Sequence, residues 1–296
     1  AGDLSAGVVD PAGRMIAQAV TGTPGHVNTM AAAIPHFIDD IGPERIFPGD
    51  VYITNDPWKG TGHLHDITVC TPVFRPTGGQ EGDTERLIGF FASTAHVVDI
   101  GGRGYGPDGK EVYEEGINIP IMKWVDRGTL NRDLVNIVRV NVREADQVIG
   151  DIYAQQVGNN VGARKLIEML DETRLPDIEE VSRQIRDRTE TAVRAAVAAV
   201  PDGVYTSEIT IDGFDEPVTI ACAVTVTGNE LTVDYAGTSP QVNRGINVVL
   251  NYTHAYSTYT LMAALAPGIP NNEGAFRPLK VSAPAGSVLN CRRPAP

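Results

Sequence analysis

The chain has 296 residues, of which 42% are hydrophobic and 21% charged, and its formal net charge at pH 7 is −13. This composition is typical of a globular protein with a sizeable core, and the length allows one large domain or two smaller ones. The few Lys and Arg residues are scattered through an acidic chain, which argues against nucleic acid as a partner. No apolar run approaches the ~20 residues of a membrane span, so we expect no membrane partner.

The cysteines predict a cytoplasmic location. They are three in number, far apart and without CxxC spacing: Cys70, Cys222 and Cys291. This pattern fits small buried residues in a reducing compartment better than a disulfide framework.

The first part of the chain predicts strands around one helix. Alternating residues in "AGVVD" and "RMIAQAV" predict a β-hairpin, and residues 28–41 suit a helix that Gly42 and Pro43 end. Three strands follow, in "DVYITND", "DITVCTPVF" and "RLIGFFASTAHVV". The polar, glycine-rich stretches 75–85 and 101–116 predict loops.

The second part predicts helices and then strands. Apolar spacing of three and four predicts helices at 129–142 and 144–170, and a clearer one within 176–200. Period-two stretches after Pro201 predict an antiparallel meander of three strands, followed by a helix in 247–265 and a strand in 279–284.

We therefore expect an α+β fold of mostly antiparallel sheets with packed helices. A boundary near Pro201 predicts a domain at 1–200 that carries the candidate site and a β-meander plus helix region at 201–296, unless both belong to one domain. The chain begins and ends in strand-like sequence, so we expect a truncated piece of a longer chain.

One repeated pattern suggests chemistry. His63 to Ile67 and His96 to Ile100 both read H-x-x-D-I, which places a histidine three residues before Asp66 and before Asp99. Positions i and i+3 of a flat strand face opposite sides, so each pair can share a ligand only if the backbone turns between them. If the two strands are neighbours, imidazoles and carboxylates meet and form a ligand set suited to Zn²⁺, Mn²⁺ or Fe²⁺.

A structural alternative stands beside this hypothesis. An H-x-x-D pair can also be an Asp that caps a turn beside a His bonded to a backbone carbonyl. His65 competes with Asp66 as a ligand, because it shares a face with His63 in a regular strand. Glu114 and Glu115 could act as general bases or form a solvated loop pair. The remaining histidines look isolated, and we interpret them as surface or hydrogen-bonded core residues: His26, His36 and His254.

Nucleotide-binding motifs are missing from the sequence. It contains no GxxxxGK[ST], no GxGxxG between a strand and a helix, and no GxSxG elbow. If ATP is used, we expect another chain to bind it.

Several blocks together carry a family resemblance. They are "GDVYITNDPWKGTGHLHDITVCTPVF", "AHVVDIGGRG", "EEGINIP", "DYAGTSPQVNRGIN" and "GIPNNEGAFRPLKVSAPAGSVLN". In sequence and order they resemble the hydantoinase B/oxoprolinase family, which includes the matching subunits of acetone and acetophenone carboxylases. Family members are usually much longer, which again predicts a truncated piece.

The resemblance implies a subunit of an ATP-dependent heteromeric enzyme. A hydantoinase A-type ATPase partner would bind ATP with Mg²⁺ and phosphorylate an amide or enol oxygen of a small cyclic amide or ketone. This chain would supply a transition-metal site, with His63, Asp66 and His96 as ligands and Asp99 close by. His65, Glu114 or Glu115 would then carry the proton. Many hydantoinase-like members have a proline at position 65 and a second histidine at position 97, so the departures here put a more histidine-rich site in question.

Three functions follow as hypotheses. The first is ATP-dependent hydrolysis of cyclic amides of the hydantoin or 5-oxoproline type, through a phosphorylated intermediate. The second is ATP-dependent ketone carboxylation of the acetone or acetophenone type. The third is a non-catalytic scaffold whose H-x-x-D turns are structural.

Overall fold

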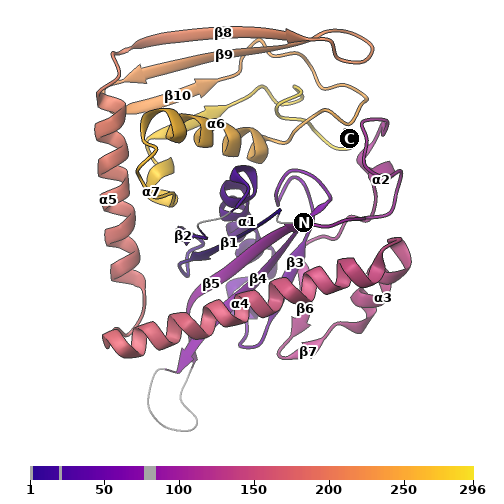
Figure 1. Cartoon of the computed structure of the whole chain (residues 1–296), viewed down its shortest axis with the longest axis vertical. Helices are drawn as coiled ribbons and strands as arrows, with labels where there is room; N and C mark the ends of the chain where they lie inside the picture. Colours follow the sequence, from indigo (N-terminus) through magenta and orange to yellow (C-terminus); the bar gives the residue numbers. More distant parts are fainter. Residues whose placement is uncertain (1–2, 20–21, 77–84) are drawn as a thin grey trace.

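The computed structural model describes residues 3–19, 22–76 and 85–296, and a large antiparallel sheet lies in its lower half (Figure 1). Every neighbouring pair of strands in this sheet is antiparallel. The strand order is β2 (Met15–Gln18), β1 (Leu4–Val9), β5 (Glu85–His96), β4 (Asp66–Pro76), β3 (Val51–Thr54), β6 (Met122–Asp126) and β7 (Thr129–Leu130). The structure confirms the predicted hairpin and the three strands after it. Most of the predicted loop 75–85 lies outside the described residues.

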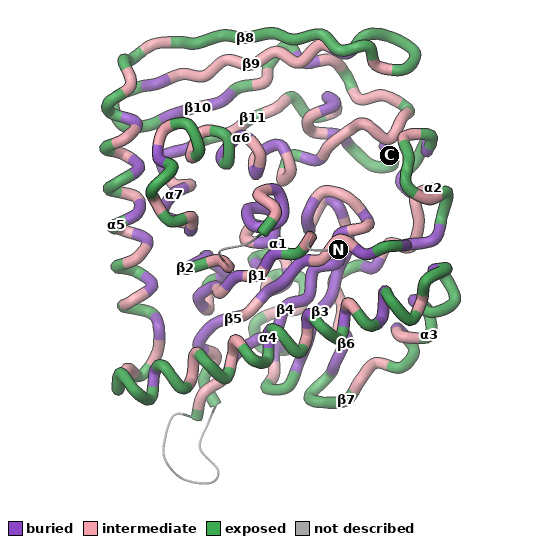
Figure 2. The backbone as a smooth tube through the Cα atoms, in the orientation of Figure 1, coloured by how far each residue is buried: buried purple, intermediate pink, exposed green. Residues whose placement is uncertain are grey.

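Helices cover both faces of this sheet. α1 (Pro24–Ile41) packs on one face and α4 (Ala145–Thr173) on the other. Successive strand residues therefore enter different cores, so Tyr52 packs with Phe37 of α1, whereas Ile53 joins the cluster that contains Ile152 of α4. β4 is consequently buried along most of its length (Figure 2).

The predicted helices exist, but several bounds differ. α1 begins at Pro24 rather than at residue 28, because proline is well suited to a first helical turn. The predicted helix 129–142 starts too early, since β7 precedes α3 (Arg132–Asn141). The Asn131 side chain caps α3 by accepting a hydrogen bond from the Leu134 N–H. The loop 101–116 contains a short helix, α2 (Val112–Glu115), and α5 (Glu179–Ala198) lies within the predicted 176–200.

A smaller sheet forms the opposite end of the molecule (Figure 1). Its order is β11 (Leu279–Ser282), β10 (Glu230–Asp234), β9 (Val218–Thr227) and β8 (Gly203–Ile211). The meander β8-β9-β10 is antiparallel as predicted, whereas β10 and β11 are parallel. Two parallel strands need a long crossover connection, and the one between β10 and β11 contains α6 (Leu250–Leu265) and α7 (Glu273–Phe276).

α6 joins the two halves of the fold. It lies between the smaller sheet and α1, and it contacts both β11 and α1 (Figure 1). The architecture is α+β with mostly antiparallel sheets, as expected. The division near Pro201 falls between α5 and β8, and whether it separates two domains stays a prediction. Among the described residues, no helix has both the length and the apolar character that crossing a bilayer requires.

Candidate metal centre

The two repeated motifs meet at one end of neighbouring strands. Asp66 is the first residue of β4 and His96 the last residue of β5, and the two are paired in the antiparallel ladder. The His96 Nδ1 atom lies 3.0 Å from Asp66 Oδ1. The sequence motifs thus converge because the start of one antiparallel strand faces the end of the next.

A turn brings His63 to the same carboxylate. Gly62 has φ +102, a left-handed conformation that favours glycine, and the Asp66 N–H donates to the His63 carbonyl across the turn. The His63 Nε2 atom consequently lies 2.8 Å from Asp66 Oδ2. The pair can share one ligand although its spacing would separate it in a flat strand.

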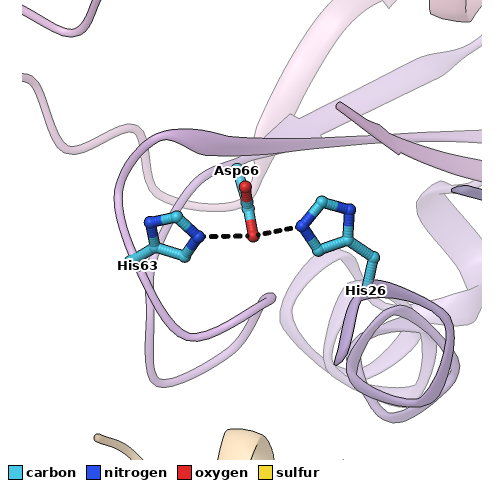
Figure 3. Close-up of side chains that lie close together, drawn as sticks. All are labelled: His26, His63 and Asp66. Atoms are coloured by element: carbon cyan, nitrogen blue, oxygen red, sulfur yellow. Dashed lines mark ion pairs between the residues drawn. The ribbon is translucent and has the colours of Figure 1, made fainter. Parts of the chain in front are cut away.

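A third histidine comes from the opposite side. His26, near the start of α1, is buried and places its Nε2 atom 2.9 Å from Asp66 Oδ2 (Figure 3). Our interpretation of His26 as isolated was wrong, although it is a buried core residue. Its approach depends on how α1 packs on the sheet, which no local motif reveals. The one available signal was a polar residue on the apolar helix face that also carries Met30 and Phe37.

The carboxylate is held as an anion. Burial alone would raise the pKa of Asp66, but its contacts with His26, His63 and His96 outweigh burial and lower it. For His26, burial lowers the pKa, whereas the contact with Asp66 raises it, and the net change is upward. The group therefore consists of one buried carboxylate anion that three imidazoles contact.

Two imidazole nitrogens converge on one oxygen of Asp66. The Nε2 atoms of His63 and His26 lie 2.8 and 2.9 Å from Asp66 Oδ2, and the Asp66 side chain is fully buried. A buried carboxylate needs such partners, because an unpaired charge away from water is costly. His26, His63 and Asp66 each offer a ligand atom, and these atoms lie within 4.8 Å of one another. The set of two nitrogens and one oxygen fits a divalent transition metal, with further positions left for substrate or water.

His65 lies beside this group rather than in it. Its ring stacks on His96 with centroids 5.1 Å apart, and Tyr105 packs against its edge at 5.3 Å. Burial, with help from the neighbouring His96 and His63, lowers the pKa of His65 to about 4. At pH 7 it is a neutral imidazole that can accept a proton.

The three remaining predicted carboxylates have different surroundings. Asp99 is not in the group of candidate ligands: it accepts hydrogen bonds from the Gly101 N–H at 3.1 Å and from Arg143 Nη1 at 2.9 Å, which fixes the following loop. Glu114 forms an ion pair with Arg103. Glu115 is half-buried, and burial raises its pKa although the charge of His63 lowers it.

Comparison with known proteins identifies the family. The sequence model of Hydantoinase B/oxoprolinase matches residues 1–296. The chain belongs to this family. Among curated members of the hydantoinase B/oxoprolinase family, it is 33% identical over 315 residues to the B component of a putative D-/L-hydantoinase from Pseudomonas sp. (strain NS671), covering 99% of this chain and 52% of that relative.

Two solved structures share the fold of this chain. The crystal structure of the ATP-dependent caprolactamase from Pseudomonas jessenii matches with a TM-score of 0.89 and 31% identity, over 100% of this chain and 50% of that one. Nucleotide-free acetone carboxylase matches with a TM-score of 0.83 over 98% of this chain and 40% of that one, and at 21% identity it shows the shared fold alone. The chain thus spans about half the length of these relatives.

Proposed function

We propose that this chain carries the metal-bearing site of an ATP-dependent heteromeric enzyme that hydrolyses cyclic amides of the hydantoin or 5-oxoproline type. A hydantoinase A-type partner would bind ATP with Mg²⁺ and phosphorylate the amide oxygen. The family membership and the hydantoinase and caprolactamase relatives support this class of reaction. The free cysteines support a cytoplasmic location.

The observation that carries the proposal is that the Nε2 atoms of His26 and His63, which come from different elements, converge on one buried oxygen, Asp66 Oδ2, at 2.9 and 2.8 Å. One imidazole is enough for a structural Asp-His pair, whereas two imidazoles and a carboxylate within 4.8 Å of one another form a metal-ligand set. We propose His26, His63 and Asp66 as the ligands, with His96 holding the other oxygen of Asp66. In this proposal His96 positions Asp66 and Asp99 fixes the following loop, while the roles of His96 and Asp99 as ligands stay predictions.

The chemistry fits a ring amide, which is a poor electrophile at neutral pH. Phosphorylation of the amide oxygen makes the ring carbon more electrophilic, so water can add to it. The C–N bond then breaks, the ring nitrogen leaves as an amine, and the resulting acyl phosphate is hydrolysed by a second water to carboxylate and phosphate. A bound divalent ion would supply Lewis acidity, polarising a carbonyl and acidifying a water. His65, which is neutral at pH 7, and Glu115, whose half-buried carboxyl has a raised pKa, would carry the proton.

Elemental analysis of the purified full-length complex tests the metal site. His26→Gln should reduce bound zinc, manganese or iron and substrate-dependent ATP turnover by at least about tenfold, because it removes one proposed ligand. His36→Gln, on the same helix but outside the group, is the matched control and should leave both unchanged. If the native complex contains no transition metal and turns over normally after both substitutions, the chain is a scaffold and the proposal fails.

Bicarbonate dependence separates hydrolysis from ketone carboxylation. Hydrolysis of a cyclic amide consumes water, so ATP turnover with hydantoin or a lactam should not respond to bicarbonate. Turnover that requires bicarbonate and a ketone would replace this proposal with the carboxylase alternative.

A further inference from the structure

A cavity of about 410 Å³ lies between α6 and the inner face of the smaller sheet, and we call it the α6 cavity. Three residues of β9 that point to the same face line one side: Ile220, Cys222 and Val224. Its size is within the range of small-molecule pockets.

The walls of the α6 cavity carry no charge. Among the described residues that line it, none is Lys, Arg, His, Asp or Glu. Three of the hydroxyl groups have protein partners: Tyr235 and Ser257 hydrogen-bond each other at 2.7 Å, and Thr253 donates to the Leu289 carbonyl at 2.6 Å. An occupant therefore meets a largely apolar surface, and a buried carboxylate would find no counter-charge.

Two tyrosines connect this cavity to the candidate metal centre. Tyr252 and Tyr256 lie one helical turn apart on α6, line the cavity, and pack together with ring centroids 4.6 Å apart. The Tyr252 ring lies so close to Gly62 that a Cβ there would come within 2.6 Å of it. The Tyr256 ring likewise would lie 2.5 Å from a Cβ on Gly25.

These glycines directly precede two proposed ligands, His63 and His26. The tyrosine pair thus lines the cavity and also contacts the backbone that carries the ligands.

We propose that the α6 cavity is the specificity pocket of the enzyme and accepts the uncharged, apolar part of a neutral cyclic amide. The amide itself would lie toward His26, His63 and Asp66, and the tyrosine pair would set the size of the ring. This inference rests on the proposed function and narrows it: neutral lactams and hydantoins are substrates, and rings that bear a carboxylate, such as 5-oxoproline, are not.

Thiol protection tests the pocket without measuring activity. Cys222 is the one cysteine among the residues that line the cavity, while Cys70 and Cys291 are buried elsewhere and act as internal controls. In the full-length complex, ε-caprolactam should slow the labelling of Cys222 by N-ethylmaleimide, as read by peptide mass spectrometry. L-5-Oxoproline at the same concentration should not. Equal protection by both compounds, or by neither, would overturn the proposal.

A pair of substitutions on adjacent residues of β9 gives the second test. Cys222→Phe fills the cavity, whereas Ala223→Phe puts the same side chain on the opposite face, because strand residues alternate. Cys222→Phe should raise the KM for ε-caprolactam by at least about tenfold, comparable to misfitting one methylene in an apolar pocket. Ala223→Phe should leave it unchanged.

The two proposals fail in different ways. If the complex binds a transition metal and hydrolyses lactam with ATP, but both variants have the native KM, the pocket assignment is wrong and the proposed function stands. If no metal is bound and no lactam is turned over, the proposed function is wrong. Since the labelling test uses the native chain, it remains decisive if Cys222→Phe does not fold.

Discussion

The contact between Gly62 and Tyr252 predicts that Gly62→Ala destabilises the fold for two separable reasons, the backbone conformation of residue 62 and the crowding of the Tyr252 ring. Gly62→Ala adds a Cβ at φ +102, where a side chain is strained, and within 2.6 Å of the Tyr252 ring. Left-handed backbone costs about 1–2 kcal/mol for a residue with a Cβ, and overpacking adds about 1–3 kcal/mol, so we expect a loss of about 2–5 kcal/mol in the free energy of unfolding.

Gly104→Ala isolates the backbone contribution. Gly104 has φ +87, and a Cβ there would have no neighbour within 4 Å. This variant should therefore lose only about 1–2 kcal/mol. Urea titration of both variants and the native chain, followed by circular dichroism, measures the difference. Adding Tyr252→Ala to Gly62→Ala should recover part of the stability that the glycine substitution costs.

The same substitution should weaken metal binding. A shift of the turn moves His63 away from Asp66, and supporting residues of metal sites typically affect affinity by about 10–100-fold. Competition with a chromogenic chelator measures this. If Gly62→Ala is no less stable than Gly104→Ala and binds metal normally, then Tyr252 does not support the ligand turn, and our reasoning about α6 is refuted.

Two further predictions concern charges away from the ligands. Burial tends to raise the pKa of Asp99, but hydrogen bonds, mainly from the Arg143 N–H, lower it overall, so Asp99 stabilises the fold at neutral pH and this contribution is lost as the pH falls below its ordinary range near 3.8. Asp99→Asn should thus be less stable at pH 7 by about 1–3 kcal/mol, and less sensitive to acid, in urea titrations at pH 7 and pH 3. Arg186→Met removes the buried partner of Asp10, which keeps only its pair with the partly exposed Arg14, and should cost about 1.5–3 kcal/mol, whereas the exposed Arg183→Met on the same helix should leave the stability almost unchanged. Equal effects of the two arginine variants would contradict the assigned role of the buried pair.

The sequence was sufficient for the strands that carry the site. The stretches "DITVCTPVF" and "RLIGFFASTAHVV" predicted β4 and β5, and the repeated H-x-x-D motif suggested a joint site if these strands are neighbours, which the pairing of Asp66 with His96 confirms. Gly62 signalled the turn that His63 needs. These features depend on local backbone preferences, which a sequence states directly.

Features that depend on distant packing were not predictable. His26 reaches Asp66 only because α1 lies on that face of the sheet, and two residues so far apart in the sequence carry no joint signal. β6 was missed because "MKWVD" is short and not strictly alternating, so pairing with β3 rather than intrinsic preference fixes it as a strand. Asp99 shared the motif but turned toward Arg143, which shows that a repeat in sequence need not repeat a role.

The secondary-structure elements that carry the proposed ligands determine how the site can be re-engineered. A strand carries Asp66, a packed helix carries His26, and a strand end holds His96, whereas His63 sits on a glycine turn. The centre thus has one adjustable member in an otherwise rigid set. Libraries that aim to change the metal or the reaction should vary His63 and His65 first and keep Gly62 and the buried Leu64, because changes at the two histidines alter one ligand and its neighbour and leave the supporting core intact.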